Sequence, residues 1–141
     1  MSEESTTPDL VELVRGAVAT ANRRRDFDAM MSFYAPDAVW DMSPMGMGTF
    51  EGLAAIRGFF EDWFGSYAEW AMETETILDL GNGVVYTVND QHARLVGSTG
   101  AVRLRDAWVC DFVEGLIVRL TVYPDIDEAR AAAERLAEER G

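Results

Sequence analysis

Hydrophobic residues recur with the period of a helix in the first part of the chain. Six of them fall on one face over residues 10–21: Leu10, Leu13, Val14, Ala17, Val18 and Ala21. Thr7 and Pro8 suit the cap and the first position of this helix. Asp26 suits the cap of a second, short helix that runs to Tyr34, because Pro36 stops it. Between the two, the arginines of residues 23–25 place positive charge at the carboxyl end of the first helix.

Two further helices are predicted later in the chain. Residues 53–64 carry an unusually broad apolar arc, made of Leu53, Ile56, Phe59, Phe60, Trp63 and Phe64. A last helix follows Asp125, which can cap it, with acidic residues in its first turn.

Strand patterns occupy the space between the helices. Residues 38–42 read as a first strand, followed by a loop over residues 43–48 that contains Pro44, Gly46 and Gly48. Four longer strands are predicted over residues 70–80, 84–96, 101–113 and 116–123, separated by glycine-containing turns. The second half is therefore an antiparallel meander, and helices placed before and after a sheet indicate an α+β fold.

Alternation along the last two strands predicts which side chains face inward. If Glu114 and Gly115 form a two-residue turn, one face carries mainly aliphatic residues: Arg105, Ala107, Val109, Asp111, Val118, Leu120 and Val122. We expect this face to be concave and to pack under the helices. The opposite face carries Asp106, Trp108, Cys110, Phe112, Ile117, Arg119, Thr121 and Tyr123. A bulge would reverse part of this assignment, which keeps Trp108 and Tyr123 as pocket candidates.

Length and charge narrow the class of protein. The 141 residues suit one domain spanning 1–141, with residues 1–7 expected to be disordered. Twelve basic residues against 25 acidic ones give a net charge of -13, which argues against nucleic-acid binding. The sequence has no lysine, which removes Schiff-base chemistry. Without a membrane-spanning apolar run or a signal peptide, and with Cys110 as the only cysteine, we expect a cytoplasmic protein.

Three residues are the catalytic candidates. Asp41 ends the first strand. A carboxylate beside an apolar cavity can have its pKa raised by burial into the range useful for general acid or base catalysis. Alternatively, Asp41 caps a turn near Ser43. His92 is the only histidine and can act as acid or base, or be structural. Arg105 can bind an oxyanion, or can form a salt bridge with Asp41, Asp106 or Asp111. One histidine and one cysteine argue against a metal site.

Aromatic, sulfur-containing and amide side chains are the candidates for binding a flat apolar ligand, because such pockets are mostly apolar with few polar groups. The substrate-binding candidates are Tyr34, Trp40, Met45, Met47, Phe60, Trp63, Gln91, Trp108 and Tyr123. Phe59 and Phe64 belong to the same aromatic set, of which about half is expected to be plain core.

Several passages resemble the nuclear transport factor two-like superfamily, which includes SnoaL-like polyketide cyclases, ketosteroid isomerase and limonene epoxide hydrolase. They are residues 26–41 and 52–60, the segment 112–117, and Tyr123-Pro124-Asp125. The resemblance implies a cone-shaped α+β barrel, in which a strongly curved mixed or antiparallel sheet wraps around N-terminal helices in the cystatin-like manner. It also implies homodimerisation, and an apolar outer face carrying Trp108, Ile117 and Tyr123 would need such a cover.

The chain departs from these relatives at the positions that carry their chemistry. The helical tyrosine of ketosteroid isomerase matches Val18, and the acidic residue near the last strand of the cyclases and of limonene epoxide hydrolase matches Val122. The lone His92 departs from scytalone dehydratase, which uses a histidine pair.

The resemblance implies a cofactor-free isomerase, cyclase or dehydratase acting on a small hydrophobic carbonyl or polyketide-like compound. Asp41 or His92 would move the proton, and Arg105 and Tyr34 would stabilise the oxyanion. The alternatives are a noncatalytic ligand-binding or protein-interaction member, and an epoxide hydrolase.

Overall fold

A computed structural model describes residues 9–23 and 25–141. The elements follow in the order α1 (Leu10–Arg23), α2 (Phe27–Met31), β1 (Tyr34–Asp41), a short 3-10 turn η1 (Ser43–Met45), β2 (Thr49–Glu51) and α3 (Leu53–Gly65). Strands β3 (Tyr67–Gly81), β4 (Val84–Leu95), β5 (Ala101–Val113) and β6 (Leu116–Tyr123) then precede the last helix, α4 (Ile126–Arg140). Helices before and after a six-stranded sheet confirm the α+β class.

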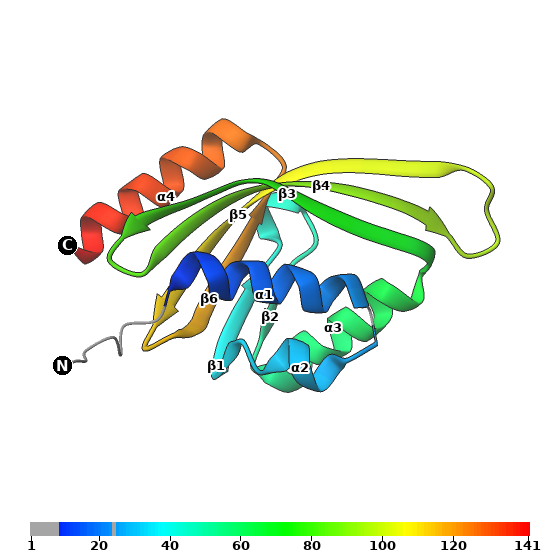
Figure 1. Ribbon diagram of the computed structural model, residues 1–141, viewed down its shortest axis with the longest axis horizontal. Coiled ribbons are helices and arrows are strands. Elements are labelled where there is room, and N and C mark those ends of the chain that lie inside the picture. Colours follow the sequence, from blue (N-terminus) through cyan, green and yellow to red (C-terminus); the bar gives the residue numbers. More distant parts are fainter. Residues whose placement is uncertain (1–8, 24) are drawn as a thin grey trace.

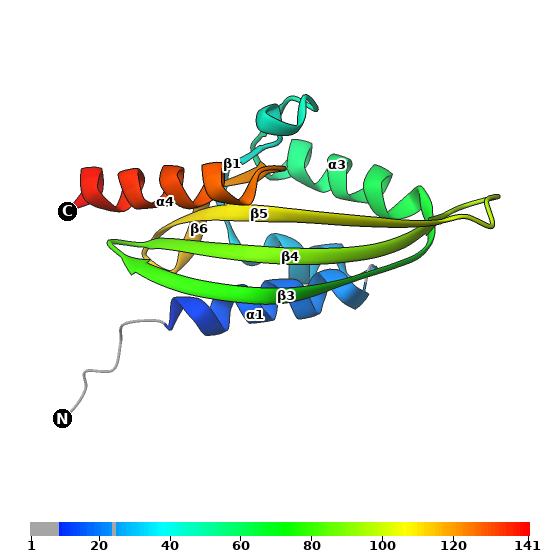
Figure 2. The same ribbon diagram turned by 90° about the horizontal axis from the view of Figure 1, so that it is seen from above.

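The sheet is mixed and open, with the strand order β2-β1-β6-β5-β4-β3. Strands β3 to β6 form the predicted antiparallel meander, whereas β1 runs parallel to β6. Figure 2 shows the three long strands side by side, with the β4–β5 hairpin reaching beyond α3. The predicted curved sheet covered by N-terminal helices is therefore the observed architecture.

Helices α1, α2 and α3 lie on one side of the sheet and α4 lies on the other (Figure 1). The inner side holds the main core, which contains Val14 and Val18 of α1, Ile56 and Phe60 of α3, and buried residues of every long strand. Hydrophobic burial on this side holds the first three helices against the open sheet. The larger core therefore lies between the sheet and helices α1 to α3.

A second, smaller core lies under α4 on the outer side. Ala129, Ala133 and Ala137 of that helix pack on Tyr86, Val88, Ala107 and Val109 of the sheet. Asp125 caps α4 as predicted, since its side chain accepts a hydrogen bond from the Glu128 N–H at 3.0 Å. The small alanine face allows the helix to lie close to the strands.

The N-terminal boundaries differ from the prediction in two places. The second helix ends at Met31, and β1 begins at Tyr34 rather than at residue 38. Tyr34 already pairs with Ile117 of β6, so tertiary pairing overrides the helical continuation. The short strand β2 was not predicted; its three residues lie between the expected loop over residues 43–48 and the helix expected from residue 53. The proposed caps Thr7 and Pro8 lie outside the described residues.

The prediction of which β5 face is concave was wrong, and a bulge in β6 explains it. Glu114 and Gly115 do form the two-residue turn, with φ values of 53° and 81°. Phe112 then pairs with Ile117 but Asp111 pairs with Arg119, which leaves Val118 as an extra residue. Leu120 and Val122 therefore belong to the inner core as expected, but together with Trp108, Cys110 and Phe112, while Ala107 and Val109 face α4.

This reversal removes the stated reason for a dimer. Trp108 and Ile117 are buried in the inner core, and Tyr123 packs beside the α4 cluster. Homodimerisation stays a prediction. No helix in residues 9–23 or 25–141 is long and apolar enough to cross a membrane.

Candidate functional site

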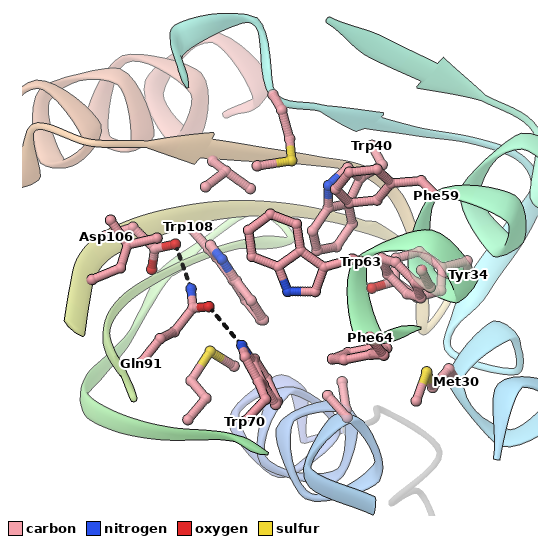
Figure 3. Close-up of a pocket in the computed structure, with 17 residues that line it drawn as sticks. Met30, Tyr34, Trp40, Phe59, Trp63, Phe64, Trp70, Gln91, Asp106 and Trp108 are labelled. Carbon is pink, nitrogen blue, oxygen red and sulfur yellow. Dashed lines mark hydrogen bonds between the residues drawn. The ribbon is translucent and has the colours of Figure 1, made fainter. Parts of the chain in front are cut away.

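A cavity of about 60 Å³ lies between the inner face of the sheet and helices α1 to α3 (Figure 3). Its walls are mostly aromatic and sulfur-containing side chains drawn from α1, α2, α3 and five of the strands. The lining residues are Ala17, Ala21, Met30, Tyr34, Trp40, Met42, Phe59, Phe60, Trp63, Phe64, Trp70, Met72, Gln91, Leu104, Asp106, Trp108 and Val122. All four tryptophans of the chain are among them.

Ring contacts hold the aromatic wall in place. Trp40 of β1 meets Phe60 of α3 edge-on, with ring centroids 4.8 Å apart, and meets Trp108 of β5 at 5.8 Å. Phe64 and Trp70 are joined in the same way at 5.0 Å. Such edge-to-face pairs each add stability beyond their buried area. The wall is therefore a set of interlocked rings contributed by the helix layer and the sheet.

Asp106 is the ionisable acid in this lining. Its side chain belongs to β5 and is 2% exposed. It accepts hydrogen bonds from Gln91 Nε2 at 2.8 Å and from Asn89 Nδ2 at 3.2 Å. Burial raises the pKa of Asp106 to about 6, although the two hydrogen bonds act in the opposite direction. Near neutral pH this carboxyl can both accept and release a proton.

The amide of Gln91 is oriented by Trp70. The indole N–H of Trp70 donates to Gln91 Oε1 at 3.0 Å, and Figure 3 shows the chain of bonds from Trp70 through Gln91 to Asp106. An indole nitrogen can only donate, so the Gln91 oxygen must face Trp70 and the Gln91 NH₂ must face Asp106. Trp70 thereby keeps a donor on the carboxylate.

Tyr34 supplies a second polar group to the cavity. Tyr34 is 7% exposed, and burial together with the nearby Cys110 raises the pKa of the Tyr34 hydroxyl. The hydroxyl therefore stays protonated at physiological pH. Figure 3 shows Tyr34 across the cavity from Asp106. The pair consists of a carboxyl that titrates near neutrality and a neutral hydroxyl donor.

The cavity is small compared with ligand pockets, which usually measure roughly 300 Å³ or more. Met30, Met42 and Met72 are part of its wall, and methionine side chains repack easily. A guest larger than a few atoms must displace some of these side chains.

Asp41 lies outside the cavity lining. It follows Trp40, and because successive strand residues point to opposite faces, its carboxylate faces away from the cavity. It accepts hydrogen bonds from the Ser43 N–H at 2.8 Å and from Thr49 Oγ1 at 3.2 Å, and pairs with Arg119 at 2.6 Å. Burial alone would raise the pKa of Asp41, but the bonds from Ser43 and Arg119 lower it. The residue fixes the loop after β1, which is the turn-capping alternative.

His92 and Arg105 also face away from the cavity, next to the lining residues Gln91 and Asp106. The His92 side chain is 51% exposed and lies 3.5 Å from Asp90. Arg105 forms a two-pronged ion pair with Glu75, at 3.0 and 3.1 Å, rather than with any of the three aspartates considered. Asp41, His92 and Arg105 therefore do not converge on the cavity.

Six of the nine predicted substrate-binding residues line the cavity: Tyr34, Trp40, Phe60, Trp63, Gln91 and Trp108. The other three do not. Met45 packs against the outside of the main core, Met47 is 44% exposed, and Tyr123 lies beside α4. Met45 and Met47 belong to the loop after β1 that Asp41 holds, and neither side chain lines the cavity.

Asp106 was the main residue that sequence reasoning missed. It was assigned to the outer face, because the expected pairing of β5 with β6 had no bulge; the alternative with a bulge, which reverses the faces, is the one that the structure has at Val118. Trp70 and Met72 were also missed, because the sequence did not predict which face of β3 points inward. The available signal was the pair Trp70 and Trp108, two large aromatics that suit a buried face better than a solvated one.

Metal-binding geometry is not built into this part of the fold. Within the described ranges, no three His, Cys, Asp or Glu side chains gather as a metal site would require. Cys110 is buried beneath the wall, and burial raises the pKa of its thiol to about 12.

Comparisons with known proteins agree with this architecture. Solved structures share the fold at low identity. An NTF2-like protein of Burkholderia pseudomallei is 21% identical with a TM-score of 0.72, covering 90% of this chain and 98% of that one. TerC, crystallised with polyporic acid, is 18% identical with a TM-score of 0.71, covering 89% and 97%. SalBIII, an epoxide hydrolase/cyclase-like enzyme of pyran ring formation in salinomycin, is 21% identical with a TM-score of 0.69, covering 79% and 87%.

The sequence family is defined by a direct match. No protein of curated function is similar enough in sequence to count as a relative. The signature of the SnoaL-like domain, however, matches residues 14–120, which is most of the chain and includes every residue that lines the cavity except Val122. This chain therefore belongs to the SnoaL-like domain family.

Proposed function

We propose that this protein is an acid/base enzyme that isomerises, cyclises or dehydrates a small hydrophobic carbonyl compound in the cavity, without a cofactor. Asp106 transfers the proton, and the Tyr34 hydroxyl donates a hydrogen bond to an oxygen of the substrate. This reassigns the proton transfer from Asp41 or His92 to Asp106. Of the two expected oxyanion contacts, Arg105 and Tyr34, it keeps only Tyr34.

The observation that carries the proposal is the state of the Asp106 carboxyl. It is 2% exposed and bonded to neutral amides, and the pKa near 6 lies where a general base or acid works best at physiological pH. A carboxyl kept in an apolar cavity at a cost to stability is a recognised mark of a functional site. The aromatic wall suits the apolar part of a substrate.

Relatives in fold lend support of a more general kind. SalBIII is described as an enzyme of ring formation, and TerC was crystallised with an oxygenated small molecule, polyporic acid. The TerC structure supports the idea that a protein of this fold can hold a small organic molecule.

A noncatalytic ligand-binding role is the second candidate, and two observations favour it. The catalytic candidates Asp41, His92 and Arg105 do not line the cavity. Val122 supplies only a methyl surface where the resemblance to the cyclases implies an acid. Both roles need the same cavity, but only the enzymatic one needs Asp106 to ionise.

Proton abstraction can be tested before the substrate is known. In deuterated buffer, NMR follows the exchange of α-protons in a panel of small cyclic and aryl ketones. We expect the protein to accelerate exchange for at least one ketone, with a rate that rises with pH around an apparent pKa near 6. The Asp106→Asn variant should lose at least about 100-fold of this rate.

His92→Gln is the matched control, because His92 is exposed on the opposite face and should leave the rate unchanged. Exchange that survives in Asp106→Asn, or that disappears in His92→Gln, would contradict the assignment. A folded protein that binds these ketones without accelerating exchange would favour the noncatalytic role.

A further inference from the structure

Trp40 carries a hydrogen-bond donor that the protein itself leaves unused. The residue is 7% exposed and lines the cavity. Its indole N–H is buried and has no acceptor in the part of the chain that the structure describes. Figure 3 shows the ring at the cavity wall with its nitrogen on the cavity side. Buried donors are nearly always paired, because an unpaired one loses its bond to water without compensation.

Four aromatic rings contact the indole of Trp40. The centroids of Phe60, Trp108, Phe59 and Tyr34 lie 4.8, 5.8, 6.2 and 6.3 Å from that of Trp40. A ring face is a weak acceptor compared with an oxygen atom. The indole of Trp70 in the same wall shows the contrast, since its N–H is bound to Gln91 Oε1 at 3.0 Å.

We propose that the Trp40 N–H is the recognition point for an uncharged oxygen atom of the ligand, a carbonyl, phenol or ether oxygen. This inference rests on the proposed function, because it concerns the same cavity. It adds a specificity-determining residue and restricts the ligand class: the ligand must present an acceptor oxygen to β1 while its apolar body lies among the rings.

The charge of the lining supports an uncharged oxygen. None of the described residues that line the cavity is an arginine or a histidine. Asp106 is ionised at neutral pH in an apolar site, where like charges repel strongly. A carboxylate or phosphate ligand would meet that repulsion with no cation to offset it. Organic acids and phosphorylated compounds are therefore disfavoured.

Two probes of matched shape test the role of the oxygen. Acetophenone and α-methylstyrene differ only by a carbonyl oxygen in place of a methylene group. Their association constants are measured by calorimetry, and the preference is the constant for acetophenone divided by that for α-methylstyrene. Replacing Trp40 by 3-benzothienylalanine keeps the bicyclic ring and removes the N–H. We expect this replacement to lower the preference about three- to tenfold, the usual worth of one neutral hydrogen bond.

Trp40→Phe, which also removes bulk, should lower the preference by a similar factor. In ¹⁵N-labelled protein, acetophenone should shift the indole N–H signal of Trp40 downfield of its position with α-methylstyrene, since the two probes share the phenyl ring and differ only in the acceptor oxygen. An unchanged preference in the benzothienyl protein, a Trp40 signal at the same position with both probes, or failure of both probes to bind would each overturn the proposal.

Asp106→Asn separates this test from that of the proposed function. The variant should keep the preference for acetophenone while losing proton exchange. A lost preference in the benzothienyl protein with exchange unaffected by Asp106→Asn would leave Trp40 as a recognition residue and contradict catalysis. A preference that survives in the benzothienyl protein, together with proton exchange that is lost in Asp106→Asn, would contradict the role of Trp40 and leave catalysis by Asp106 in place.

Discussion

Replacing Asp106 by asparagine should change stability in a way that depends on pH. The Asp106 pKa is about 6 in the folded protein, whereas the value without burial is 3.8. Between these values the folded protein holds a proton that the unfolded chain releases. Stability of the wild type must therefore fall as pH rises from about 4 to about 6, and the penalty stays in place at higher pH. The asparagine variant cannot ionise at this position, so its stability lacks this pH dependence.

The magnitude follows from the two pKa values. At about 1.4 kcal/mol for each pH unit between them, the penalty amounts to about 3 kcal/mol above pH 6. The free energy of unfolding of Asp106→Asn minus that of wild type should rise by most of this amount, about 2 kcal/mol, between pH 4 and pH 6.5. The new amide faces two donors, but Asn89 can turn because the Thr74 hydroxyl that it contacts can donate or accept. The change in stability caused by these rearranged hydrogen bonds does not depend on pH.

Urea unfolding followed by circular dichroism at five pH values measures this difference. Asp41→Asn serves as the control, because its difference from wild type should stay nearly constant over this pH range. The Asp41 pKa is lowered in the folded protein, so its stabilisation is present above pH 3.8 and lost as pH falls. A difference between wild type and Asp106→Asn that stays constant from pH 4 to pH 6.5 would refute a buried, uncompensated carboxyl in the cavity.

Three further predictions follow from single contacts. Trp70→Phe frees the Gln91 amide to turn its oxygen toward Asp106, which should raise the Asp106 pKa above 6 in a ¹³C NMR titration; an unchanged value would show that Trp70 does not orient Gln91. Asp41→Asn should cost about 2 kcal/mol at pH 7 and speed amide hydrogen exchange at Ser43, and unaltered exchange would show that Asp41 does not hold the loop. Gly83→Ala should cost more than about 2 kcal/mol in urea unfolding, because a Cβ there meets the Phe112 carbonyl oxygen at a positive φ; Gly81→Ala, with a similar φ and open space, should cost less, and equal costs would contradict the clash.

Much of the fold could be predicted from local patterns. Helical periodicity located α1 and α3, the Asp125 cap located α4, and the glycine turns located the boundaries of the β3 to β6 meander. The start of β1 could not be predicted, because Tyr34 is placed by its pairing with Ile117, a residue far away in the sequence. Local propensity carries no information about such a partner.

The candidate site shows a more specific limit. Each predicted catalytic residue is the immediate neighbour of a residue that lines the cavity: Asp41 follows Trp40, His92 follows Gln91, and Arg105 precedes Asp106. Alternation in a strand means that an error of one residue moves a side chain to the opposite face. On β5 the error came from the bulge at Val118, which shifts the pairing with β6. The aromatic wall was predicted more successfully, because large rings favour the interior whatever the register.

The central claim is that the cavity holds an ionisable carboxyl in an apolar surrounding. A ¹³C NMR titration of the aspartate carboxyls, with Asp106 assigned through its absence in Asp106→Asn, measures this directly. The account predicts a midpoint near pH 6 for Asp106. A midpoint near 3.8, as for a carboxyl in water, would contradict it.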